Sequence, residues 1–170
     1  ALSAWGPGVL AGVAFLCTQK TIYHAAALGC GMLLVGFDAG RLRGALTYGL
    51  RFAAGFGLPL LVYAGAFGGS RFHEVLRAIF VSPLAFAASL SPYSDGLRRF
   101  VLQPLERNPA AYLVSAVGLA ITFSAWRETP ARVRAAAVAT GLIVVLVFAH
   151  RQPWPYVFVM ALPFLAIWAP

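Results

Sequence analysis

Apolar stretches alternate with short polar links along most of this chain. A helix that crosses a membrane needs about 20 consecutive, mainly apolar residues. Six runs approach that length, at 5–18, 21–37, 46–67, 109–126, 133–149 and 154–168. The pattern therefore predicts an all-α, polytopic transmembrane helix bundle of about six spans, with residues 1–170 forming one transmembrane domain.

Residues 68–108 interrupt the pattern, because short apolar pieces there alternate with charge and proline. Between 71 and 80, charged side chains recur every three residues and apolar residues fill the positions between them. A helix with one such polar stripe is suited to lie in the plane of the membrane surface. Residues 97–105 form a second, shorter stretch of the same kind. We expect 68–108 to be an interfacial segment.

Composition agrees with a membrane protein. Hydrophobic residues make up 61% of the chain and charged residues 11%, whereas soluble domains carry roughly 25% charged residues. The net charge of +8 would suit nucleic acid in a soluble protein. Here the cations lie between apolar runs, so we expect anionic lipids as partners and no nucleic acid.

The arginines also predict an orientation. Arg41 and Arg43 follow the second run, and Arg127, Arg132 and Arg134 fill the link between the fourth and fifth. If both links are cytoplasmic, as the positive-inside rule prefers, counting crossings places three other segments together on the outer face. These are the link at Lys20, the segment 68–108 and the link at 150–156.

The polar side chains of these three outer segments are the candidate binding residues. They are Lys20, Arg71, Arg98, His150, Arg151 and Tyr156. Guanidinium groups bind phosphate oxygens in bidentate fashion, so the set suits a phosphate or an anionic lipid head group. Five of these residues also have a simpler interpretation: Lys20 as a cation snorkelling from a helix end, Arg151 and Tyr156 as part of an interfacial belt, and Arg71 and Arg98 as solvated or lipid-facing.

Small residues and prolines predict how the helices pack. Pairs of glycines four residues apart allow two helices to approach closely, and three such pairs are Gly8/Gly12, Gly36/Gly40 and Gly65/Gly69. Pro109 fits the first turn of a helix. Pro59 and Pro163 fall inside apolar runs and predict kinks.

Two short motifs resemble those of a known enzyme class. Gly8 and Gly12, followed by Thr18 and Lys20, resemble the GxxxGxxxxTK helix and break of GT-C type glycosyltransferases, and the stretch 151–156 is similar to their cation, proline and tyrosine ending. This class includes protein O-mannosyltransferases and the lipid A aminoarabinose transferase, which use polyprenyl-phosphate-linked sugar donors. The resemblance implies that Lys20, Arg151 and Tyr156 approach the phosphate of the donor.

In that class the catalytic aspartate lies in a first outer loop, ahead of everything that matches this chain. We therefore expect the C-terminal membrane portion of a glycosyltransferase, inactive alone and completed by an N-terminal half. No sequence motif for a cofactor is found; a divalent metal is compatible with the reaction but nothing indicates one. The expected location is a bacterial inner membrane. The alternative is a non-catalytic lipid-binding or scaffold subunit, or a small transporter.

Overall fold

The computed structural model describes residues 4–82, 85, 103, 105–149 and 161–168. Among these the regular structure is helical throughout, so the predicted all-α class is confirmed. The chain divides into two compact units, residues 1–90 and 91–170, and each is described by itself.

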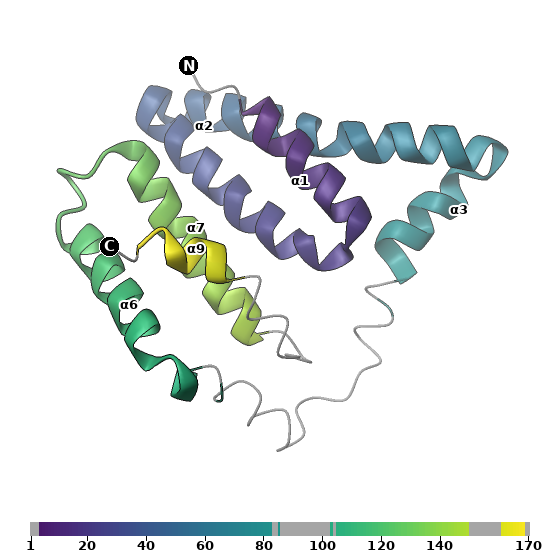
Figure 1. Ribbon diagram of the computed structural model, residues 1–170. Coiled ribbons are helices and arrows are strands. Elements are labelled where there is room, and N and C mark those ends of the chain that lie inside the picture. The colour runs from purple at the N-terminus through teal and green to yellow at the C-terminus, as the bar shows by residue number, and fades with distance from the viewer. Residues whose placement is uncertain (1–3, 83–84, 86–102, 104, 150–160, 169–170) are drawn as a thin grey trace. The chain divides into compact units, whose positions relative to one another are not determined.

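Unit 1 begins with α1 (Trp5–Cys17), a short 3₁₀ turn η1 (Gln19–Thr21) and the long α2 (Ile22–Gly68). The backbone of α2 leaves helical geometry at Gly40 and Arg41. The helix therefore folds into two segments, 22–39 and 42–68, which run back along each other (Figure 1). The sequence predicted two spans here, separated by a link of several residues; the structure shortens that link to a two-residue kink.

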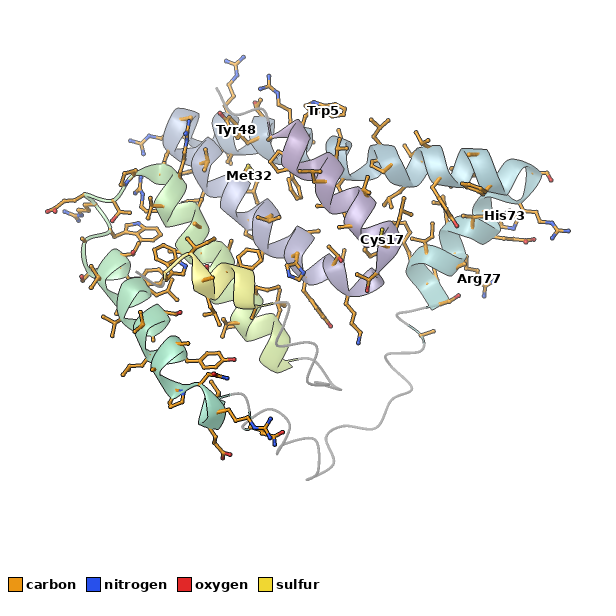
Figure 2. All side chains as sticks on the ribbon, in the orientation of Figure 1. Trp5, Cys17, Met32, Tyr48, His73 and Arg77 are labelled. Carbon is orange, nitrogen blue, oxygen red and sulfur yellow. The ribbon has the colours of Figure 1, made fainter. Side chains whose placement is uncertain are left out.

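Glycine backbones bring the two segments of α2 together. A Cβ atom on Gly36 would lie 2.5 Å from the carbonyl oxygen of Gly44, so only glycine fits this approach. Further along the hairpin, Met32 and Tyr48 pack against a buried core that includes Phe52, and Figure 2 shows their side chains between the segments.

Helix α1 packs on the second segment of α2. A Cβ atom on Gly8 would meet the carbonyl oxygen of Phe52, and one on Gly12 would meet that of Phe56. Of the predicted close-packing glycines, Gly8, Gly12 and Gly36 are therefore confirmed. Among the described residues, nothing lies within 4 Å of a Cβ built on Gly40, Gly65 or Gly69, so their predicted role in close packing is not seen there.

The end of α2 leads into the segment that the sequence marked as interfacial. Helix α2 stays helical through Pro59, and the residues where its backbone angles are not helical are Gly40 and Arg41. After Gly68 follow a 3₁₀ turn η2 (Gly69–Arg71), α3 (Phe72–Leu76) and a π-helical turn η3 (Arg77–Val81). Gly69 has φ +48°, a left-handed conformation that glycine adopts without steric cost. It turns the chain so that α3 departs from the line of α2 (Figure 1).

Unit 2 contains α6 (Pro109–Ser124), α7 (Ala131–Ala149) and the short α9 (Leu162–Ala166). Pro109 occupies the first turn of α6, as predicted. Pro163 occupies the first turn of α9, where it lacks no hydrogen bond. The predicted kink at Pro163 is therefore wrong, because the proline begins a helix rather than interrupting one.

Within the described residues, one helical stretch is long and apolar enough to cross a membrane. It is Ile22–Val81, which includes the kink of α2 and the turn at Gly69. Helices α1 and α6 are apolar but shorter. The predicted count of six spans stays a prediction.

Candidate functional site

The break between α1 and α2 positions Lys20. Helix α1 ends where Thr18 adopts an extended conformation, with φ −154° and ψ 122°. The backbone N–H of Thr18 donates to the carbonyl oxygen of Ala14 at 3.0 Å, and the hydroxyl of Thr21 donates to the same oxygen at 3.3 Å. These bonds close the turn and place Lys20, part-exposed, at its tip.

The break is electrostatically suited to an anion. Lys20 lies two residues before Ile22, the first residue of α2, and the N-terminus of a helix carries a partial positive charge. A cationic side chain and a helix N-terminus therefore lie together at one point of the chain. Tyr23 and His24 follow in the first turn of α2 and are half-buried, and Nδ1 of His24 is buried. That placement agrees with a packing role for these two residues.

The segment 69–81 presents its charged side chains outward. Arg71, His73, Glu74 and Arg77 are all exposed. Figure 2 shows the side chains of His73 and Arg77 extending from α3 and η3. The amphipathic helix predicted over 71–80 is thus present as a sequence of short helical turns rather than one regular helix.

An aromatic contact joins this segment to the end of α1. The rings of Phe80 and Phe15 are stacked, with centroids 5.7 Å apart and an interplanar angle of 23°. Phe15 also contacts Phe56 of α2, at 5.6 Å between centroids. Phe15 lies within the last turn of α1, and Arg77 lies three residues before Phe80. The structure therefore brings the segment carrying Arg77 to the end of unit 1 that carries Lys20.

Four of the six predicted site residues cannot be placed in this way. Arg98, His150, Arg151 and Tyr156 lie outside the described residues. Arg71 stands nine residues before Phe80, at the other end of the 69–81 segment, so the convergence of all six residues stays a prediction.

A second polar cluster, in unit 2, was not predicted. The indole Nε1–H of Trp168 donates to Oγ1 of Thr140 at 2.9 Å, and Thr140 donates to the carbonyl oxygen of Ala136 at 2.8 Å. Oγ of Ser115 lies 3.0 Å from the carbonyl oxygen of Leu165 in α9. These groups fasten the end of α9 to α6 and α7. The only sequence signal was hydroxyl residues within apolar runs, which are equally compatible with a bond to their own helix.

Acidic groups are sparse in the part of the chain that the structure describes. No group of three or more His, Cys, Asp or Glu residues that could hold a metal ion is found there. Glu74 is the acidic residue of the 69–81 segment, and it is exposed. What the described end of unit 1 offers chemically is thus cationic binding rather than proton transfer. Comparison of the chain with known protein families, curated proteins and solved structures gives no match.

Proposed function

We propose that this chain is the membrane portion of a glycosyltransferase, and that it holds a polyprenyl-phosphate-linked sugar donor by its phosphate. The observation that supports the proposal is made at one end of unit 1. The Phe15–Phe80 contact holds the arginine-bearing segment 69–81 against the end of α1, and Lys20 lies in the helix break that follows α1. Lysine attracts a phosphate as a point charge and arginine binds it with paired N–H groups.

The dimensions of α2 support membrane insertion. The kink divides the single long apolar helix into segments 22–39 and 42–68, which are about 27 Å and about 40 Å long by the rise of an α-helix. The hydrocarbon core of a bilayer is about 30 Å thick. The first segment is close to the length of one crossing and the second is longer, as in a tilted helix, so we assign two of the six proposed spans to this hairpin.

Exposed side chains support the same placement. Leu42, Leu50 and Phe67 are 68%, 69% and 75% exposed on α2. Large apolar side chains exposed along a helix suit contact with lipid, whereas a soluble monomer rarely exposes a continuous apolar patch. We place these faces in contact with acyl chains, in a bacterial inner membrane.

The chemistry divides between binding and proton transfer. In the proposed reaction an acceptor hydroxyl attacks the anomeric carbon of the sugar, the bond from that carbon to the phosphate oxygen breaks, and polyprenyl phosphate leaves. The hydroxyl proton passes to a carboxylate acting as general base, which we assign to an N-terminal half of the same protein. Lys20, Arg71 and Arg77 stabilise the negative charge of the departing phosphate. We propose that Arg98, His150, Arg151 and Tyr156 also contact this phosphate.

Donor binding tests the proposal directly. A photoreactive polyprenyl-phosphate analogue is crosslinked to the membrane-embedded protein and to a Lys20→Gln variant. Losing one charged hydrogen bond to the phosphate is expected to weaken binding about tenfold. Arg43→Gln removes one positive charge at the kink end of unit 1 and is the matched control. Equal labelling of Lys20→Gln and unmodified protein would exclude Lys20 from the site.

The same experiment separates the transferase from a lipid-binding scaffold. Phosphatidylglycerol added in excess competes with the probe only weakly if the site recognises the polyprenyl phosphate. Competition as strong as that of unlabelled polyprenyl phosphate would favour the scaffold.

Sidedness provides a second test. With Cys17 and Cys30 replaced by alanine, cysteines are introduced singly at positions 20, 71 and 132. An impermeant maleimide is expected to label positions 20 and 71 from one side of sealed vesicles and position 132 from the other. Labelling of 20 and 71 from opposite sides would show that they share no binding site.

A further inference from the structure

The turn between α6 and α7, together with the first turn of α7, forms a compact corner that we define as residues 125–134. The backbone N–H groups of Glu128 and Thr129 donate to the carbonyl oxygen of Ala125, each at 3.0 Å. The hydroxyl of Thr129 donates to the same oxygen at 2.9 Å. The corner is therefore held by several local hydrogen bonds, which define the path of its backbone.

An aromatic stack positions one arginine of the corner. The rings of Phe123 and Trp126 are stacked 5.4 Å apart, with an interplanar angle of 8°. The guanidinium carbon of Arg134 lies 5.5 Å from the centre of the Trp126 ring, a cation–π distance. Arg134 is half-buried and its Nε is buried. Its guanidinium is thus held in one place before any ligand binds.

The corner concentrates positive charge. Arg127 and Arg132 are exposed on either side of the turn, and Glu128 is the acidic residue among 125–134. Arg132 and Arg134 also stand in the first turn of α7, which contains no acidic residue. Cations there are unfavourable, because the N-terminus of a helix is itself positive. A bound anion would relieve that repulsion.

An apolar stripe leads to the corner along α6. Leu113, Val117 and Ile121 follow one another every four residues and are 66%, 49% and 61% exposed. Residues four apart share one face of a helix. The chain therefore passes from exposed apolar side chains on α6 to exposed cations in the corner that follows it, an order that matches a ligand with hydrocarbon chains and an anionic head.

We propose that the 125–134 corner binds the head group of an anionic phospholipid, whose acyl chains lie along the α6 stripe. Arg134 contacts the phosphate from its fixed position on Trp126, while Arg127 and Arg132 complete the cationic surround. This site is separate from the proposed donor site and rests on the proposed membrane placement alone.

The test measures which lipids the protein retains. The chain is reconstituted in vesicles of equal parts phosphatidylcholine and phosphatidylglycerol, extracted, and its bound lipids are quantified by mass spectrometry. The unmodified protein is expected to be enriched in phosphatidylglycerol. An Arg132→Gln/Arg134→Gln variant is expected to lose that enrichment by about fivefold for each arginine removed. Arg41→Gln/Arg43→Gln removes the same charge from the kink of α2 and is expected to leave it unchanged.

Each other outcome has a distinct meaning. An equal loss in the Arg41/Arg43 control would show general charge attraction and overturn the site. Arg134→Lys keeps the positive charge, and with it the charge bias that orients the helices in the membrane, but it removes the planar guanidinium that stacks on Trp126. Undiminished enrichment of phosphatidylglycerol in that variant would therefore overturn the role of Arg134. Failure of the unmodified chain to float with the vesicles would instead refute the membrane placement. Flotation with equal retention of both lipids would refute the lipid site alone.

Discussion

A single methyl group at Gly8 is expected to destabilise unit 1. The added Cβ of Gly8→Ala would meet the carbonyl oxygen of Phe52 and would lie 3.0 Å from the backbone nitrogen of Phe56 and 3.1 Å from Cα of Gly55. All three are backbone atoms of α2, so no side-chain rotation can make room and the helices must separate. Overpacking of this kind costs about 1–3 kcal/mol.

Gly6 provides a matched control on the same helix, because a Cβ there has no atom within 4 Å. Replacing glycine by alanine in a helix raises helix propensity by about 1 kcal/mol, and both substitutions share that gain. The difference in free energy of unfolding between Gly6→Ala and Gly8→Ala therefore isolates the steric cost, about 1–3 kcal/mol.

The measurement is unfolding in mixed dodecyl maltoside and sodium dodecyl sulfate micelles, followed by the helical circular dichroism signal. Gly8→Ala should unfold at a lower fraction of dodecyl sulfate than Gly6→Ala. Gly12→Ala should behave like Gly8→Ala, because its Cβ would meet the carbonyl oxygen of Phe56. Equal stability of the three variants would mean that α1 does not pack closely on α2.

Three further changes test other parts of the fold, the first two by the same unfolding assay and the third by proteolysis. Thr140→Val removes the acceptor of the Trp168 indole and is expected to cost about 1 kcal/mol; a double-mutant cycle with Trp168→Phe should show coupling, and additive effects would contradict the hydrogen bond. Arg41→Gly relieves a φ of +50° and should stabilise the protein by about 1 kcal/mol. Arg43→Gly lies inside the helix and should destabilise it by a similar amount. If Arg43→Gly were the more stable variant, the kink at Arg41 would be contradicted. Phe80→Ala removes the stacked ring pair at the end of α1 and should speed proteolysis within 69–81; an unchanged cleavage rate would contradict that contact.

Helix positions were predictable where an apolar run has a clear physical end. The run expected at 109–126 is α6 at Pro109–Ser124, and the run expected at 133–149 is α7 at Ala131–Ala149. The link expected after residue 37 was less predictable. Its charged residues are compatible with helix, so the chain stays helical on both sides and reverses over two residues.

The contacts of individual glycines were not predictable from spacing. Gly8 and Gly12 meet α2, while Gly65 and Gly69 face open space at the same spacing. The four-residue interval shows that two glycines share a helix face, but not which face meets a neighbour. Lys20 could be proposed as a site residue from sequence because a cation there interrupts two apolar runs, and its role stays a prediction. The aromatic contact that brings the 69–81 segment toward it depends on tertiary folding.

The end of α9 shows how a helix terminus is buried against other helices of unit 2. The last carbonyl groups of any helix lack partners within that helix, and in hydrocarbon no water is present to satisfy them. Here Oγ of Ser115 stands 3.0 Å from the carbonyl oxygen of Leu165, and the backbone N–H of Trp168 donates to the same oxygen at 3.0 Å. A Cβ on Gly118 would lie 2.9 Å from the carbonyl oxygen of Trp168, so the absence of a side chain on α6 allows this close approach. A buried helix end needs partners of this kind in the core of any protein, and a helix that ends at membrane depth needs them too. The contacts of Ser115 and Gly118 therefore explain how the end of α9 is buried within unit 2, and they agree with the proposed membrane placement without depending on it.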